Sequence, residues 1–189
     1  MLEKSMPFVF EVVIAWLYSH LLEYFLHKHL LHDNKRKKWF KTHFGEHHWS
    51  ARKRLMLDPK YFGSPSITGD PEIKGLIVLG LLHAPIALFY PFAYATLILC
   101  AISYYLQHRW MHTSWDYARQ HASWHYDHHM APDQNCNWGV RLPIFDYLFG
   151  TRKYYKGSKK EIVKFTIMKS RIINGLTEKA NKDRRNEIE

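Results

Sequence analysis

The segment His121-Ala-Ser-Trp-His125-Tyr-Asp-His128-His129 carries four histidines within nine residues. In an α-helix, positions i, i+4, i+7 and i+8 share one face, so the spacing predicts a helix with a stripe of imidazole rings. Neutral imidazole is a common ligand for zinc, copper, nickel and iron. The segment therefore predicts a metal-binding helix, where an ordinary core helix would carry leucine.

Two further groups of histidines are spaced like metal ligands. His108 and His112 stand four residues apart, so a helix places them on one face, where both can bind a single ion. His43 and His47 have the same spacing, and the adjacent His48 points away from them. This second arrangement suits ligands that are shared between two neighbouring ions.

The last group lies at the end of an N-terminal apolar segment. His27 and His32 are five residues apart, so on a straight α-helix they point about 140° away from each other. We expect them to serve different ions, unless the helix unwinds between them. Glu23 precedes His27 by one helical turn and is expected to accept the ring N–H, which would fix the metal-binding tautomer.

The expected ligand set contains ten imidazoles: His27, His32, His43, His47, His48, His108, His112, His125, His128 and His129. One tetrahedral zinc needs four ligands or fewer, so ten suit two ions with about five ligands each. Asn137 is expected either to hydrogen-bond a metal-bound water or to serve as a turn residue before Gly139. The spacing leaves the role of His121 open, and His20 and His83 are interpreted as buried histidines with ordinary hydrogen bonds.

Two apolar segments, near residues 7–31 and 75–106, predict membrane helices. The first, Phe8 to Leu31, has 24 residues and reaches about 36 Å, enough to cross the hydrocarbon layer. The second is divided at Tyr90-Pro91, and it either crosses as a thin hairpin or only dips into the membrane. The expected fold class is all-α, with membrane helices and a cytoplasmic helical cap that carries the histidines.

The charge pattern supports a membrane interpretation over nucleic-acid binding. The net charge is +10, and the basic residues follow the apolar segments directly. By the positive-inside rule, residues 33–75 are cytoplasmic and the N-terminus is outside. The two cysteines, Cys100 and Cys136, form no Cys-x-x-Cys pair, which favours a site on the reducing side. Residues 57–75 are expected to be irregular, as a lid or a connector.

The histidine spacings H-x4-H, H-x3-H-H, H-x3-H and H-x2-H-H together resemble the histidine boxes of the fatty acid hydroxylase superfamily, whose members are membrane di-iron oxygenases and include sterol desaturases and carotenoid hydroxylases. Residues 23–32 are similar to the first box of that family. The segments that begin at Asn137 and Phe145 are similar to its closing signature, and the resemblance spans residues 23–151. Three residues separate His43 from the His47-His48 pair, whereas many members of that family have two at this place. The resemblance therefore does not define the role of His43.

The resemblance implies a membrane enzyme that holds two iron ions, uses O2 as co-substrate and oxidises a C–H bond of a lipid. Hydroxylation of a fatty acyl or related chain is the first expectation, and a carotenoid-ring hydroxylase or a sterol or lipid desaturase is the alternative. No fused cytochrome b5 domain is recognised, so a separate donor of the ferredoxin or cytochrome b5 type is expected to supply electrons. The expected location is a bacterial inner membrane or the endoplasmic reticulum, with the site facing the cytoplasm.

Residues 1–151 are expected to form the catalytic domain and residues 152–189 a basic tail. In the tail, Ser158-Lys-Lys-Glu161 predicts a helix N-terminus, and the apolar positions Ile162, Phe165, Met168 and Ile172 alternate with lysines. Such a basic amphipathic helix is expected to lie on an anionic membrane surface.

Two other classes of function stay open at this point. A membrane metal store or transporter would place ligands along a path at mid-membrane, where only His20 and His83 are expected. A zinc hydrolase would need fewer ligands and a general base.

Overall fold

The computed structural model describes residues 7–170 and 174, and every regular element within them is a helix. The predicted all-α class is therefore confirmed. The chain divides into two compact units, Met1–Lys153 and Tyr154–Glu189. This division lies close to the predicted boundary between residues 151 and 152.

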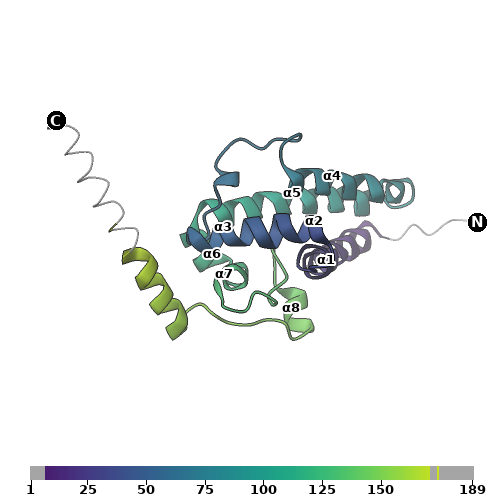
Figure 1. Ribbon diagram of the computed structural model, residues 1–189. Helices are drawn as coiled ribbons and strands as arrows, with labels where there is room; N and C mark the ends of the chain where they lie inside the picture. Colours follow the sequence, from purple (N-terminus) through teal and green to yellow (C-terminus); the bar gives the residue numbers. More distant parts are fainter. Residues whose placement is uncertain (1–6, 171–173, 175–189) are drawn as a thin grey trace, which may run out of the picture. The chain divides into compact units, whose positions relative to one another are not determined.

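The first helix begins where the sequence predicts it. Helix α1 spans Phe8–Leu26, and the π-helix η1 (His27–Leu31) continues it (Figure 1). Phe8, Phe10 and Ile14 are each more than half exposed, while Glu11, on the face turned towards α5, and His20 are buried. The helix therefore has an apolar outer surface and buries its polar groups against its neighbour.

A helical hairpin forms the second apolar block. Helix α4 (Pro71–His83) runs into the 3-10 helix η4 (Ala84–Leu88), and α5 (Pro91–Thr113) returns beside it. Helix α5 begins at Pro91, so the second apolar segment is divided at Tyr90-Pro91 as predicted. Glu11 of α1 accepts the backbone N–H groups of Phe92 and Ala93 at 3.1 and 3.2 Å. This cap fixes α5 in parallel to α1, so the C-terminal ends of both helices lie together.

Two segments, Phe8–Leu31 and Pro71–Leu88, are long and apolar enough to cross a membrane. The outer side of the hairpin is strongly apolar, because Leu81, Leu82 and Leu88 are 67 to 80% exposed. Exposed apolar surface of this extent is unusual in a soluble monomer and typical of a membrane or protein contact.

The basic connection forms a second long helix. Helix α2 (Lys37–Phe40), the π-helix η2 (Lys41–His48) and α3 (Trp49–Lys53) follow one another without a break. Residues 57–70 are irregular, as predicted, except for the 3-10 helix η3 (Pro59–Tyr61). Residues 71–75, which were also predicted to be irregular, already belong to α4, because Asp70 and Pro71 start that helix. Asp58 caps η3, and Asp70 caps α4 by accepting the backbone N–H of Glu72 at 2.9 Å.

The histidine-rich segment is not one helix from His121 onward. Helix α6 (Trp115–His121) ends at that residue, Ala122 leaves helical geometry, and α7 (Ser123–Met130) begins after it. His121 is exposed, whereas His125 is fully buried on α7. The predicted face therefore begins at His125, because the break at Ala122 turns His121 away.

A tight loop leads from α7 to the short helix α8 (Ile144–Leu148). The buried Asp146 accepts the backbone N–H groups of Trp138 and Gly139 at 2.7 and 2.8 Å and the hydroxyl of Thr151 at 2.7 Å. A Cβ on Gly139 would stand 2.3 Å from the carbonyl oxygen of Leu142. Only glycine therefore fits this close approach, and the predicted tight loop is confirmed.

In the second unit, residues 159–170 are helical. The Ser158 hydroxyl accepts the N–H of Glu161 at 3.1 Å, and the Glu161 carboxylate accepts the N–H of Gly157 at 2.6 Å, so the predicted helix start is confirmed. Of the predicted apolar positions, Ile162 is exposed and Phe165 and Met168 are partly exposed. Ile172 lies outside the described residues.

Candidate metal centre

Nine of the ten predicted ligands meet in two groups. The possible ligand atoms within each group all lie within 4.8 Å of one another. The first group is His27, His32, His43, His48 and His128, and the second group is His47, His108, His112 and His129. The prediction that these residues come together to form sites able to hold metal is confirmed.

The winding of η1 brings His27 and His32 into the same group. The N–H of His32 donates to the carbonyl oxygen of His27 at 3.2 Å, the i to i+5 bond of a π-helix. Residues five apart then face the same side, and the two rings lie 5.0 Å apart. Of the two predicted alternatives, different ions or a change in the winding of the helix, the second one holds, because the π-helix places both rings in one group.

The π-helix η2 acts in the same way on the second histidine box. His43 and His48 are five residues apart and belong to the first group, which gives His43 a place among the candidate ligands. His47, adjacent to His48, belongs to the second group. The pair therefore divides between the groups, as the predicted sharing between two ions requires, but His43 and His47 do not share one group.

The other four histidines of the two groups lie on regular α-helices. His108 and His112, four residues apart on α5, both belong to the second group, as predicted. The adjacent His128 and His129 of α7 divide between the groups, like the adjacent pair on η2. The ring of His129 lies 4.0 Å from that of His48, so the two groups are direct neighbours.

Backbone carbonyls fix the tautomer of three rings. Nδ1 of His27 lies 2.7 Å from the carbonyl oxygen of Trp138, Nδ1 of His112 lies 2.7 Å from that of Met56, and Nδ1 of His128 lies 2.6 Å from that of Cys136. A carbonyl oxygen only accepts, so each Nδ1 must carry the hydrogen. The Nε2 lone pair of each neutral ring is then free to bind a metal ion.

Carboxylates fix two rings of the second group. Nδ1 of His47 donates to Asp58 at 2.7 Å, and Nδ1 of His108 donates to Glu72 at 2.6 Å. The Tyr61 hydroxyl donates to the other oxygen of Glu72 at 2.6 Å. The sequence pattern did not identify Asp58, Tyr61 or Glu72, because these residues lie far along the chain from the rings that they contact.

The free Nε2 atoms point at one another. Nε2 of His27 lies 2.9 Å from Nε2 of His43, and Nε2 of His128 lies 3.1 Å from Nε2 of His48. Nε2 of His47 is buried and has no hydrogen-bond partner among the described residues. A buried polar atom without a partner is costly, and two nitrogens at this distance need either a ring proton or a metal ion between them. The donor set therefore fits metal ions.

Burial keeps these rings neutral, the state that binds metal. Loss of water lowers the pKa of His32 to about 2, and the same cause, with repulsion from the neighbouring rings, holds the pKa of His43 and His48 well below the usual range. In the second group burial also lowers the pKa of His47, His112 and His129 strongly.

His125 stands beside the second group. It is fully buried, its Nε2 lies 3.0 Å from Nε2 of His112, and its ring centre lies 4.6 Å from that of His129. Its other ring nitrogen has no partner among the described residues. The structure therefore places this predicted ligand in contact with the candidate site, although outside the two compact groups.

Glu23 does not contact His27 as predicted. Its carboxylate accepts the N–H groups of Val140 at 2.5 Å and Arg141 at 3.0 Å and pairs with the Arg141 guanidinium at 2.7 Å. The His27 ring turns to Trp138 instead. Glu23 thus anchors the loop that supplies the acceptor for His27, and its effect on the ring is indirect.

Asn137 is a structural residue. Its φ is +57°, its amide donates to the carbonyl oxygen of Lys153 at 2.9 Å, and its side-chain oxygen accepts the N–H of Lys153 at 2.8 Å. These features agree with the predicted turn role, and both polar atoms of the side chain are engaged within the loop. His83 donates to the carbonyl oxygen of Leu79 as expected, whereas buried His20 has no partner among the described residues for either nitrogen.

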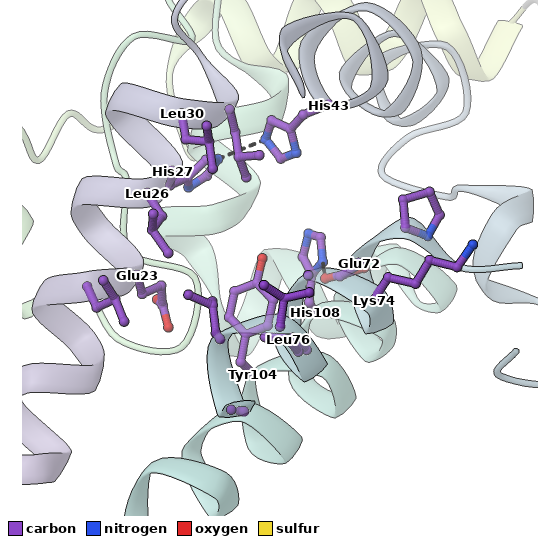
Figure 2. Close-up of a pocket in the computed structure, with 18 of the residues that line it drawn as sticks. Glu23, Leu26, His27, Leu30, His43, Glu72, Lys74, Leu76, Tyr104 and His108 are labelled. Carbon is purple, nitrogen blue, oxygen red and sulfur yellow. Dashed lines mark hydrogen bonds and ion pairs between the residues drawn. The ribbon is translucent and has the colours of Figure 1, made fainter. Parts of the chain in front are cut away.

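An apolar cavity of about 430 Å³ reaches the histidines from the side of α1, α4 and α5. His27, His43, His47 and His108, two from each group, line one end of it. Figure 2 shows Leu26 of α1 and Leu30 of η1 facing Leu76 of α4 and Tyr104 of α5 across this space. The remaining wall includes Leu22, Val78, Leu79, Leu97 and Ile98.

Comparison of the chain with protein-family models, with curated proteins and with solved structures finds no match.

Proposed function

We propose that this protein is an integral membrane di-iron oxygenase that hydroxylates a fatty acyl or related lipid chain, with O2 and external electrons. One observation carries the proposal: both groups of buried, neutral imidazoles contribute ligands to the end of a single apolar cavity. A site for a water-soluble substrate would present polar groups along its wall. Here most of the exposed lining surface is apolar, with nine leucine, isoleucine and valine side chains, although charged residues such as Glu23, Glu72 and Arg141 also border the cavity.

Iron is proposed because the histidine spacings resemble those of di-iron oxygenases and because the cavity suits a substrate without reactive polar groups. All-nitrogen sets also accept zinc, copper or nickel, so ligand type alone does not select the metal. Bound iron would supply the activation of O2 that attack on a C–H bond needs.

The residues of the chain would position the substrate beside the metal ions and exclude water from the site. His27, His43, His47 and His108 face the cavity, so a substrate chain in it would approach both groups from one side. His112, His128 and His129 are fully buried behind them. Leu26 of α1 and Leu30 of η1 line the passage next to His27 and keep water from it.

The membrane arrangement belongs to the same proposal. The candidate spans Phe8–Leu31 and Pro71–Leu88 border the cavity, so a lipid chain would enter from the hydrocarbon layer. The histidines would then lie at the cytoplasmic side. Labelling of a cysteine placed at Tyr90 by an impermeant reagent from outside would show that the hairpin crosses fully, and protection would favour one that only dips in.

A separate acidic electron carrier would fit the exposed basic residues that lie before and after the histidines of η2. These residues are Lys35, Arg36, Lys37, Lys38, Lys41, Lys53 and Arg54. Surface electrostatics of this kind control association rates and are screened by salt. Rising salt should therefore slow reduction by such a carrier and leave reduction by dithionite unchanged.

The test is metal analysis of detergent-purified protein together with lipid mass spectrometry under ¹⁸O2. Two irons per chain and one ¹⁸O atom in a lipid product are expected. Loss of two hydrogens without added oxygen would identify a desaturase, and a hydroxylated ring would identify the carotenoid alternative. A single zinc with activity in the absence of O2 would overturn the proposal in favour of a hydrolase.

The variant His125→Ala distinguishes the proposed oxygenase from a metal store or transporter. An oxygenase should lose product formation in this variant, whereas a transporter should lose metal flux across proteoliposomes. Two bound irons with unchanged lipids and measurable iron flux would contradict the enzyme.

A further inference from the structure

The two groups of histidines differ in the residues that hold them. In the second group, two ligand rings donate to buried carboxylates: His47 to Asp58 at 2.7 Å and His108 to Glu72 at 2.6 Å. Both contacts join Nδ1 to a carboxylate oxygen, which leaves Nε2 directed at the candidate metal position. Nε2 of each ring has no partner among the described residues.

In the first group, uncharged partners occupy the corresponding places: carbonyl oxygens accept from two rings, and an amide N–H group donates to a third. His27 and His128 donate to backbone carbonyl oxygens at 2.7 and 2.6 Å, and Nδ1 of His48 lies 2.8 Å from the side-chain amide of Gln134. Nδ1 of His32 has no hydrogen-bond partner among the described residues. Within the described part of the chain, no carboxylate forms a hydrogen bond or ion pair with a ring of this group.

Nearby cations do not cancel the difference. The Lys60 ammonium lies 3.5 Å from Glu72 but also 3.2 Å from Asp70, so it is shared between two carboxylates. Its side chain is 35% exposed, and water screens its charge. Arg52 also lies near this group, but its guanidinium donates to the backbone carbonyl oxygen of His129 at 2.9 Å. The two groups therefore differ in the partners of the rings themselves: carboxylates accept from two rings of the second group.

We infer that the two metal positions are unequal, and that Asp58 and Glu72 make the position formed by the second group the one that binds a divalent ion first and more tightly. A carboxylate that accepts a ring N–H makes the opposite nitrogen a stronger donor, and buried negative charge attracts the cation directly. The two residues are positioning residues that act through His47 and His108. This inference rests on the metal centre of the proposed function.

The experiment is a titration of the metal-free protein with Co2+, followed by visible absorption and by metal analysis. His43→Ala disables the first position and His112→Ala the second, so each variant reports the position that remains. We expect two affinities in the wild type, the tighter one retained in His43→Ala and lost in His112→Ala. Asp58→Asn and Glu72→Gln should each weaken the tighter affinity by about 10- to 100-fold and leave the weaker one unchanged.

The converse variant keeps the test valid if a carboxylate replacement disturbs folding. Gln134→Glu places a carboxylate against His48 and should raise the affinity of the first position by a similar factor. Gln120→Glu, on an exposed part of α6, is the matched control and should change neither affinity.

Equal affinities in the wild type, or equal weakening of both positions by Asp58→Asn, would overturn the inference and leave the oxygenase proposal intact. Absence of metal binding in the wild type would overturn both. Unequal Co2+ binding in a protein that oxidises no lipid would overturn the oxygenase proposal alone.

Discussion

His27 and His32 lie on the same side of a helix although five residues separate them, because the backbone between them is a π-helix closed by the His32 N–H to His27 carbonyl bond at 3.2 Å. The same spacing and winding recur between His43 and His48 on η2. π-Helical turns are rare and occur frequently at functional sites. Both π-helices direct their histidine pairs into the first group.

Changes in the length of η1 should have opposite effects on metal binding. Deletion of the exposed His29 leaves the two ligands four residues apart, and a regular α-helix then holds them about 40° apart on one face. Insertion of alanine after His29 separates them by six residues, which neither helix type aligns. We expect the deletion to retain the first-group metal and the insertion to lose it, as measured by metal content per chain. Loss in the deletion variant with retention in the insertion variant would contradict this account.

Replacement of one ligand in either group should abolish turnover. His112→Ala and His128→Ala each remove a fully buried ring from a group whose other members cannot move to fill the gap. We expect product formation to fall at least about 100-fold, with loss of one metal ion per chain. His121→Ala is the control, because that ring is exposed and lies outside both groups. Normal metal content in both ligand variants would argue against the assignment.

Filling the apolar cavity should block the substrate without removing metal. Leu79 lines the cavity on α4, whereas Leu82 on the same helix is 70% exposed. Leu79→Trp should lower lipid turnover at least about tenfold, because the added ring occupies the space that a chain needs. Leu82→Trp should have little effect. Equal activity of the two variants would show that the substrate reaches the metals by another route.

Acid should destabilise the metal-free protein. Histidines of the unfolded chain titrate near pH 6.5, whereas burial lowers the pKa of His32 to about 2 in the folded state and that of His43 well below its usual range. Between the folded-state and unfolded-state pKa values, the unfolded chain binds more protons than the folded chain. The free energy of unfolding is therefore undiminished by these histidines above about pH 6.5 and falls as the pH falls below it. The Tm of the metal-free protein should be lower at pH 5 than at pH 7.5. His43→Gln should show a smaller difference, and a Tm independent of pH would disprove the explanation.

The closing loop should not tolerate a side chain at Gly139. A Cβ there would stand 2.3 Å from the Leu142 carbonyl oxygen and 3.2 Å from the Asp146 carboxylate, so the backbone must move. Gly139→Ala should cost about 1–3 kcal/mol, lower the Tm by several degrees and displace the Trp138 carbonyl that holds His27. Gly63→Ala, with no atom within 4 Å of the new Cβ, is the control. Equal Tm values for the two variants would rule out the steric argument.

Local spacing was enough to predict which side chains form the site. The apolar run to Leu31 predicted α1, and the four histidine boxes contain all nine members of the two groups. This succeeds because helical periodicity acts over a few residues, so neighbours in sequence predict neighbours on a face. At η1 and η2 the backbone is π-helical, so α-helical periodicity did not predict that His27 and His32, or His43 and His48, belong to the same group.

The sequence by itself determined that the chain is helical, that two of its segments are apolar enough to span a membrane, and that its histidines come at metal-ligand spacings. Only the tertiary structure decided how the rings divide into two groups, and which acceptor holds each of them. Glu72 lies 36 residues from His108, and Trp138 lies 111 residues from His27. Such contacts depend on how α1, α4, α5 and the closing loop pack together, and no periodic pattern within one segment carries that information.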